Sequence, residues 1–209
     1  MTTSELPPDA KAVLHRYLRE AREALLWKVE GLSEREARLP RTPTGTNLLG
    51  LVKHAATVEI GYFGGVFGRP WPRPEDAPWL EAADDPDADA DALQAEFFAT
   101  TDESVAQILG LYRQVAAFAD ATIEALPLDA PGHVWWWGDG GRDVTLHQIL
   151  VHVATELSRH AGHADILREE ADGAAGLRPD NDNLAPGLDY AAFTAALRRI
   201  AEQFPEEDR

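Results

Sequence analysis

Apolar residues recur at intervals of three and four positions along most of this chain, which predicts helices rather than strands. This spacing covers four long stretches, from Pro7 to Leu32, Asn47 to Gly68, Leu93 to Leu126 and Val144 to Asp172. We expect a short separate helix ending near Thr100 at the start of the third stretch. No alternation of period two is visible, so the pattern predicts an all-α protein.

The residues between these stretches include helix caps and helix breakers. Ser33 and Glu36 fit a capping box at the start of a short helix. Thr46 or Asn47 can cap the second long helix, and Gly173 is placed to end the fourth. Four long helices joined by loops predict a four-helix bundle.

A polar linker follows the bundle and leads to a last amphipathic stretch, from Asp189 to Phe204. We therefore divide the chain into a bundle over residues 1–175 and a C-terminal extension over 176–209. The extension is expected to be a linker and a helix packed on the bundle.

Composition excludes several classes of function. The 209 residues carry a net charge of −17, whereas a nucleic-acid phosphate backbone needs a basic surface. No apolar run is long enough to cross a bilayer, and the N-terminal residues do not resemble a signal peptide, so the predicted location is the cytoplasm. The chain has no cysteine, and any thiol chemistry would need a thiol from outside.

Glu156 and His160 lie one turn apart on the predicted buried face of the fourth helix. A buried carboxylate is costly unless it is paired or coordinates a metal. His54, the only histidine of the second helix, is the best third ligand. The spacing alone leaves two alternatives open, hydrogen-bonded core residues or a carboxylate acting as a base. His152 and His163 point in nearly the same direction as Glu156 and are further candidates.

Three glycines of the second stretch, Gly50, Gly61 and Gly65, project toward the side of His54. They permit close helix packing or leave room for a ligand. Three adjacent tryptophans, Trp135 to Trp137, cannot all enter one core. They either anchor their loop on the bundle or line the mouth of a pocket. The acidic run from Glu75 to Glu103 is interpreted as a solvated surface.

The segments LLGLVKHAATVEIGYFGGVFGRP and LHQILVHVATELSRHAGHADILRE resemble the DinB-like superfamily. The branch they resemble is the mycothiol-transferase branch, which includes mycothiol-dependent maleylpyruvate isomerase. The resemblance implies a four-helix bundle with a divalent metal held by His54, Glu156 and His160. Zinc is the expected ion, although nickel, iron and cobalt also suit this donor set.

The resemblance implies a metal-dependent S-transferase for detoxification, in which mycothiol attacks a small electrophile or isomerises it. In this reading Trp136 and Trp137 bind the thiol cosubstrate and His163 is catalytic. The alternatives are a non-catalytic metal-binding bundle of a stress response and a metal-assisted hydrolase. The expected partners are the thiol and the electrophile, with no nucleic acid and no membrane, and the chain is expected to be a monomer or homodimer.

Overall fold

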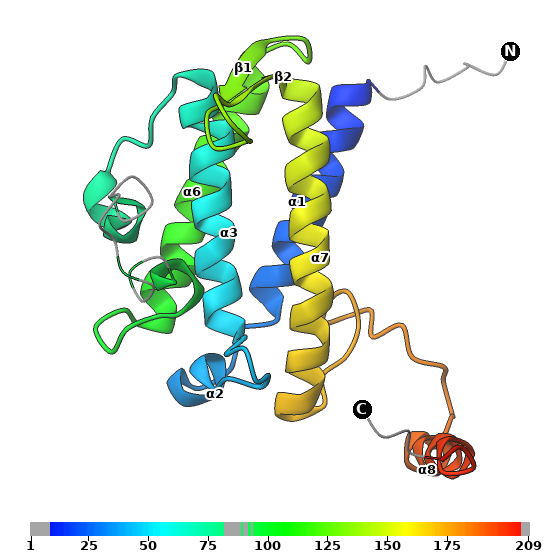
Figure 1. Ribbon diagram of the computed structural model, residues 1–209. Helices are drawn as coiled ribbons and strands as arrows, with labels where there is room; N and C mark the ends of the chain where they lie inside the picture. Colours follow the sequence, from blue (N-terminus) through cyan, green and yellow to red (C-terminus); the bar gives the residue numbers. More distant parts are fainter. Residues whose placement is uncertain (1–8, 82–88, 90–91, 93, 206–209) are drawn as a thin grey trace, which may run out of the picture.

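The four long helices form a bundle in the computed structural model, which describes residues 9–81, 89, 92 and 94–205. They are α1 (Ala10–Trp27), α3 (Leu48–Phe63), α6 (Val105–Ala125) and α7 (Leu146–Asp172). Helix α1 packs against α7, and α3 packs against both α6 and α7 (Figure 1). The predicted all-α bundle is thereby confirmed.

Side-chain caps set the starts of these helices. Ser33 and Glu36 form the predicted capping box of α2 (Glu34–Arg38), and Asn47 rather than Thr46 caps α3. Ser104 forms a second capping box, so α6 begins about a turn of helix after the expected Thr100 boundary. At the other end, Gly173 ends α7 at a φ of 79°, a conformation that favours glycine.

Two of the predicted helical stretches are longer than the helices that form. Helix α1 ends at Trp27 although its predicted stretch runs to Leu32, and α3 stops at Phe63 instead of Gly68. A 3₁₀ turn, η1 (Gly65–Phe67), follows α3. The periodicity does not register this change because a 3₁₀ turn repeats its side chains at almost the same spacing as an α-helix.

A small antiparallel hairpin corrects the expectation of no strands. Strand β1 (Pro131–Val134) pairs with β2 (Arg142–Thr145), with Pro131 opposite Thr145 and Val134 opposite Arg142. Each strand has four residues, which is too short for an alternating pattern to stand out. The hairpin lies at one end of the bundle and α2 at the other, and its turn carries the three tryptophans (Figure 1).

The described part of the connection from α3 to α6 contains three further 3₁₀ turns after η1. They are η2 (Pro74–Asp76), η3 (Pro78–Leu80) and η4 (Ala95–Phe97). Of these, η4 packs against α3. This contact places part of the acidic run on the bundle.

The interior of the bundle is apolar, with one buried ionic cluster. Large side chains that are fully buried come from all four helices: Leu18, Leu25, Leu49, Phe63, Tyr112, Ile123, Ile149 and Leu157. Arg22 of α1 forms an ion pair of 2.6 Å with Glu59 of α3, and both side chains are almost fully buried. None of the described helices is long and apolar enough to cross a membrane.

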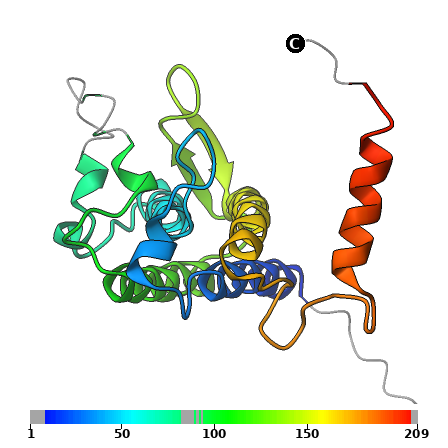
Figure 2. The ribbon, with the colours of Figure 1, turned by 90° about the horizontal axis from the view of Figure 1, so that it is seen from below.

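Helix α8 (Tyr190–Ala201) stands apart from the bundle (Figure 2). None of its residues is buried, and Phe193, Leu197 and Ile200 are exposed. The division at residue 175 and the packing of this helix on the bundle stay predictions.

Candidate metal centre

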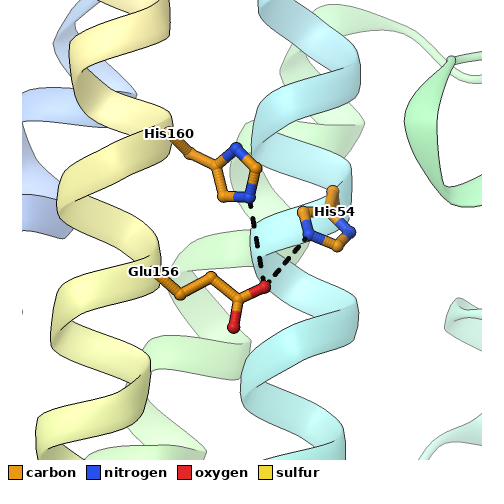
Figure 3. Close-up of side chains that lie close together, drawn as sticks. All are labelled: His54, Glu156 and His160. Carbon is orange, nitrogen blue, oxygen red and sulfur yellow. Dashed lines mark ion pairs between the residues drawn. The ribbon is translucent and has the colours of Figure 1, made fainter.

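Helices α3 and α7 bring His54, Glu156 and His160 together. One ligand atom from each residue lies within 4.8 Å of the others. Glu156 Oε1 lies between the two imidazoles, 3.5 Å from His54 Nε2 and 4.0 Å from His160 Nε2 (Figure 3). The spacing of four residues on α7 puts Glu156 and His160 on one face, and the contact of α3 with α7 adds His54.

The donor set fits a divalent metal ion. Two imidazole nitrogens and one carboxylate oxygen are ligands that catalytic zinc sites use, with a further position left for water or substrate. The three side chains are 12%, 26% and 17% exposed for His54, Glu156 and His160. Part of each side chain is therefore accessible from solvent, while the protein covers most of its surface.

Glu96 contacts His54 at Nδ1, the ring nitrogen that faces away from Glu156. His54 Nδ1 donates a hydrogen bond of 2.8 Å to Glu96 Oε2, and the ring of Phe97 stacks on the imidazole at 4.4 Å. With Nδ1 occupied, Nε2 is the nitrogen that faces Glu156. A carboxylate behind a histidine ligand is the usual arrangement at metal sites, where it fixes the tautomer and the ring orientation.

The role of Glu96 corrects the interpretation of the acidic run as a solvated surface. Glu103, in the same run, accepts a hydrogen bond from the buried Lys53 at 2.9 Å. Asp84, Asp85 and Asp87 lie outside the described residues, and Asp89 Oδ1 accepts from the backbone of Ala92. Sequence reasoning missed Glu96 because the run has no periodicity. The aromatic pair Phe97-Phe98 directly after it is the signal that marks a contact with the bundle.

The electrostatics of the centre favour a cation. Burial alone would lower the pKa of His54, but hydrogen bonds to Glu156 and Glu96 outweigh it and raise this pKa to about 9. The hydrogen bond with His54 lowers the pKa of Glu156 in spite of burial. Burial and the neighbouring His54 charge lower the pKa of His160 to about 4. Two carboxylates thus stabilise positive charge at His54, and Glu156 together with the neutral imidazole of His160 faces the candidate metal position.

The two remaining histidine candidates lie beside the triad. His152 Nε2 lies 3.3 Å from Glu156 Oε2, on the side of the carboxylate opposite the other ligands. His163 is exposed, and its ring centroid lies 5.8 Å from that of His160. The structure brings both histidines near the centre and groups neither with the three candidate ligands.

The tryptophan loop lies over Gly61 of α3 and Gly65 of η1. A Cβ atom on Gly65 would lie 2.5 Å from the Trp135 ring, and one on Gly61 would lie 3.5 Å from the Trp136 ring. A Cβ atom on Gly50 would collide with the backbone of Phe97. Gly50 and Gly65 therefore serve close packing, with a loop or turn rather than a helix as the partner, whereas Gly61 has room for a Cβ atom.

Trp136 and Trp137 also anchor the loop through one hydroxyl group. Their Nε1 atoms donate to Tyr62 Oη at 3.4 Å and 2.9 Å. Trp137 and His152 form one wall of a hollow of about 450 Å³ on the outer side of α7, whose other lining residues are His147, Gln148, Val151 and Thr155. We call this the α7 hollow. The two expectations for the tryptophans are thus both met, since Trp137 anchors the loop and lines a hollow.

Comparison with known proteins gives one family and one solved fold. Residues 13–173 match the family model described as Mycothiol-S-transferase. The chain is similar to the crystal structure of a conserved protein from Enterococcus faecalis, with a TM-score of 0.60 and 16% identity over 80% of this chain and 99% of that one. At this identity the likeness shows the fold alone. No curated protein matches the chain.

Proposed function

This chain belongs to the mycothiol-S-transferase family, and on that premise we propose that it is a metal-dependent enzyme that transfers the sulfur of mycothiol to a small electrophile. The observation that carries the proposal is the meeting of His54, Glu156 and His160 between two helices of the bundle. The charge of −17 and the partly exposed centre suit a small-molecule reaction rather than nucleic-acid chemistry.

His54, Glu156 and His160 would hold the ion, for which we propose zinc. Nickel, iron and cobalt suit the same donors. A free thiol has a pKa of about 8.5. A divalent ion bound at this centre would lower that value and so raise the thiolate fraction at neutral pH.

The residues of the chain orient the ligands and the substrates. Glu96 keeps His54 Nε2 directed at the centre through the hydrogen bond to Nδ1. The indole of Trp137 and the residues of the α7 hollow offer a surface without carboxylate, lysine or arginine side chains for the body of the thiol, with Trp136 covering α3 beside it. The exposed His163 is our candidate for moving a proton between the site and solvent.

In the proposed transfer, the thiolate sulfur forms a bond to the electrophilic carbon and the leaving group departs with its electron pair. With an unsaturated substrate, the same sulfur would add to the double bond and later leave again. This reversible addition would isomerise the double bond without net consumption of thiol.

The first test is elemental analysis of the purified protein, followed by turnover of a panel of electrophiles with and without mycothiol. We expect about one divalent ion per chain and turnover only with thiol. The His160→Ala variant should lose both metal and turnover. The matched control is His133→Ala, because His133 is an exposed hairpin residue paired with Asp143.

Three results would contradict the proposal in different ways. Turnover that needs the metal but no thiol would indicate metal-assisted hydrolysis. Bound metal without turnover of any electrophile would favour a non-catalytic metal-binding bundle. Full metal content in His160→Ala would remove this residue from the ligand set.

A further inference from the structure

The hydroxyl group of Tyr62 joins the tryptophan loop to α7. Tyr62 is 7% exposed on α3, and its oxygen lies 2.9 Å from Trp137 Nε1 and 3.0 Å from His152 Nε2. The indole group only donates, so Trp137 occupies one lone pair of this oxygen. The contact from Trp136, at 3.4 Å, is longer than an ordinary hydrogen bond.

His152 also contacts the carboxylate of Glu156. Its Nε2 lies 3.3 Å from Glu156 Oε2, whereas Oε1 of the same carboxylate faces His54 and His160. The two oxygens of Glu156 therefore have separate partners. Oε1 points to the candidate metal position, and Oε2 is the oxygen that can hold the carboxylate in place.

The negative charge of Glu156 favours the tautomer of His152 that carries its hydrogen on Nε2. If Nε2 of His152 carried a lone pair, that lone pair would face the negative oxygen of Glu156. A hydrogen bond to a carboxylate is about twice as strong as one between neutral groups, so the arrangement with hydrogen on Nε2 is favoured. With hydrogen on Nε2, His152 faces two oxygens that can accept it, Glu156 Oε2 at 3.3 Å and Tyr62 Oη at 3.0 Å.

We infer that His152 is a positioning residue of the metal centre, which holds Glu156 through Oε2 and is itself held by Tyr62 and Trp137. The chain of contacts runs from the loop through Tyr62 and His152 to Glu156. Ring packing supports it, because the His152 ring lies edge-to-face with both Tyr62 and Trp137, with centroids 4.8 Å away in each case. The inference rests on the proposed metal site and on no assumption about the thiol.

The test measures zinc affinity of the full chain by competition with a chromophoric chelator, without thiol or electrophile. His152→Leu removes the donor and should weaken zinc binding by about 10-fold or more, as for other outer partners of metal ligands. His152→Gln can place an amide N–H near the position of Nε2 and should restore most of the affinity. The matched control, His133→Leu, makes the same change at an exposed residue of the hairpin and should bind zinc as the wild type does.

A double variant tests whether Tyr62 acts through His152. Tyr62→Phe keeps the ring and removes the oxygen, so it should weaken zinc binding less than His152→Leu does. Combined with His152→Leu, it should weaken binding no further, because the link it breaks is already absent. Circular dichroism of each variant confirms that the bundle is folded.

The outcomes separate this inference from the proposed function. Wild-type affinity in His152→Leu, or equal losses in His152→Leu and His152→Gln, would overturn the positioning role while leaving the metal proposal intact. Fully additive losses of zinc affinity in the double variant would show that Tyr62 does not act through His152. A wild-type protein that binds no zinc and no other divalent ion would overturn both.

Discussion

Glu156 shows at the scale of a single residue how one carboxylate serves two purposes. Its lowered pKa means that it carries a negative charge at neutral pH, although it is mostly buried. Its Oε1 faces His54 and His160, and its Oε2 faces His152. A ligand, a base and a polar core residue would each use that charge differently, so changing the charge alone distinguishes them.

Replacing Glu156 with glutamine keeps the shape and removes the charge. If Glu156 is a ligand, zinc affinity should fall by about 10-fold or more, as for disturbed coordination shells. If it is instead a base at a site made by other residues, turnover should fall by about 10²-fold with zinc affinity unchanged. Zinc titration with a turnover assay separates the two results. Glu156→His is the companion variant and should still bind metal, since an imidazole nitrogen is also a zinc ligand.

The raised pKa of His54 predicts a pH dependence for the metal-free protein. Protonated His54 stabilises the fold because its pKa rises from 6.5 to about 9 on folding. This contribution is fully present below pH 6.5 and is lost as the pH rises through about 9. The same proton competes with metal, so zinc affinity should increase over this window.

The matched variant for this effect is Glu96→Gln, which keeps an acceptor for Nδ1 and removes one of the two charges. Thermal unfolding of both metal-free proteins between pH 6 and 10 measures the difference. We expect a smaller loss of Tm with rising pH in Glu96→Gln than in the wild type. Identical pH profiles would mean that Glu96 does not hold the proton on His54.

At the scale of the helices, a buried ionic cluster ties α1, α3 and α6 together. Both carboxylate oxygens of Glu59 accept hydrogen bonds from Arg22, at 2.9 Å and 2.6 Å, and Oε1 also accepts from Tyr112 at 2.8 Å. Arg22 additionally bonds Asp120 of α6. Glu59 and His54 lie on the same rigid helix. Holding Glu59 in this cluster therefore also holds α3 in the rotation about its own axis that directs His54 toward α7.

Removing parts of this cluster should cost unequal amounts of stability. Glu59→Leu leaves the guanidinium of Arg22 without its main partner and should lower the free energy of unfolding by about 3–5 kcal/mol. Tyr112→Phe removes one hydrogen bond to a charged group and should cost about 1.5–3 kcal/mol. Urea unfolding of both variants measures the difference. An equal cost would show that the Arg22 charge finds another partner.

At the scale of the whole molecule, the bundle and α8 make different contributions. The buried Lys28 of the α1–α2 connection bonds the carbonyl of Gly176, so the chain is tied to the bundle up to that residue. Beyond it, α8 leaves its apolar side chains exposed. The stability of the metal site should therefore depend on residues up to Gly176.

A chain ending at Gly176 tests this division. We expect it to fold with the helix content of the bundle, to bind zinc with wild-type affinity and to have a Tm close to that of the full chain. Circular dichroism, zinc titration and gel filtration of both chains provide the measurements. A large loss of Tm, or a change from dimer to monomer, would assign a structural role to α8.

The sequence by itself determined the parts of this protein that depend on neighbours along the chain. Helical spacing predicts the four long helices, and local caps such as Ser33 and Gly173 mark their ends. Glu156 and His160 could be paired from sequence because positions four apart share a helix face. His54 was the best third candidate as the only histidine of the second helix, and the resemblance of two motif segments strengthened that choice, since periodicity does not say which helices are neighbours.

Only the tertiary structure decided the contacts that depend on the paths of loops. Glu96 reaches His54 because η4 folds back onto α3, and Trp137 reaches Tyr62 because the hairpin turns over the same helix. The sequence of the tryptophan triplet is compatible with either solvent or the bundle, and the aromatic pair Phe97-Phe98 marks a contact of the acidic run without saying which residue it meets. Helix contacts follow a fixed repeat, whereas a loop contact between residues more than 40 positions apart is set by packing of the whole bundle.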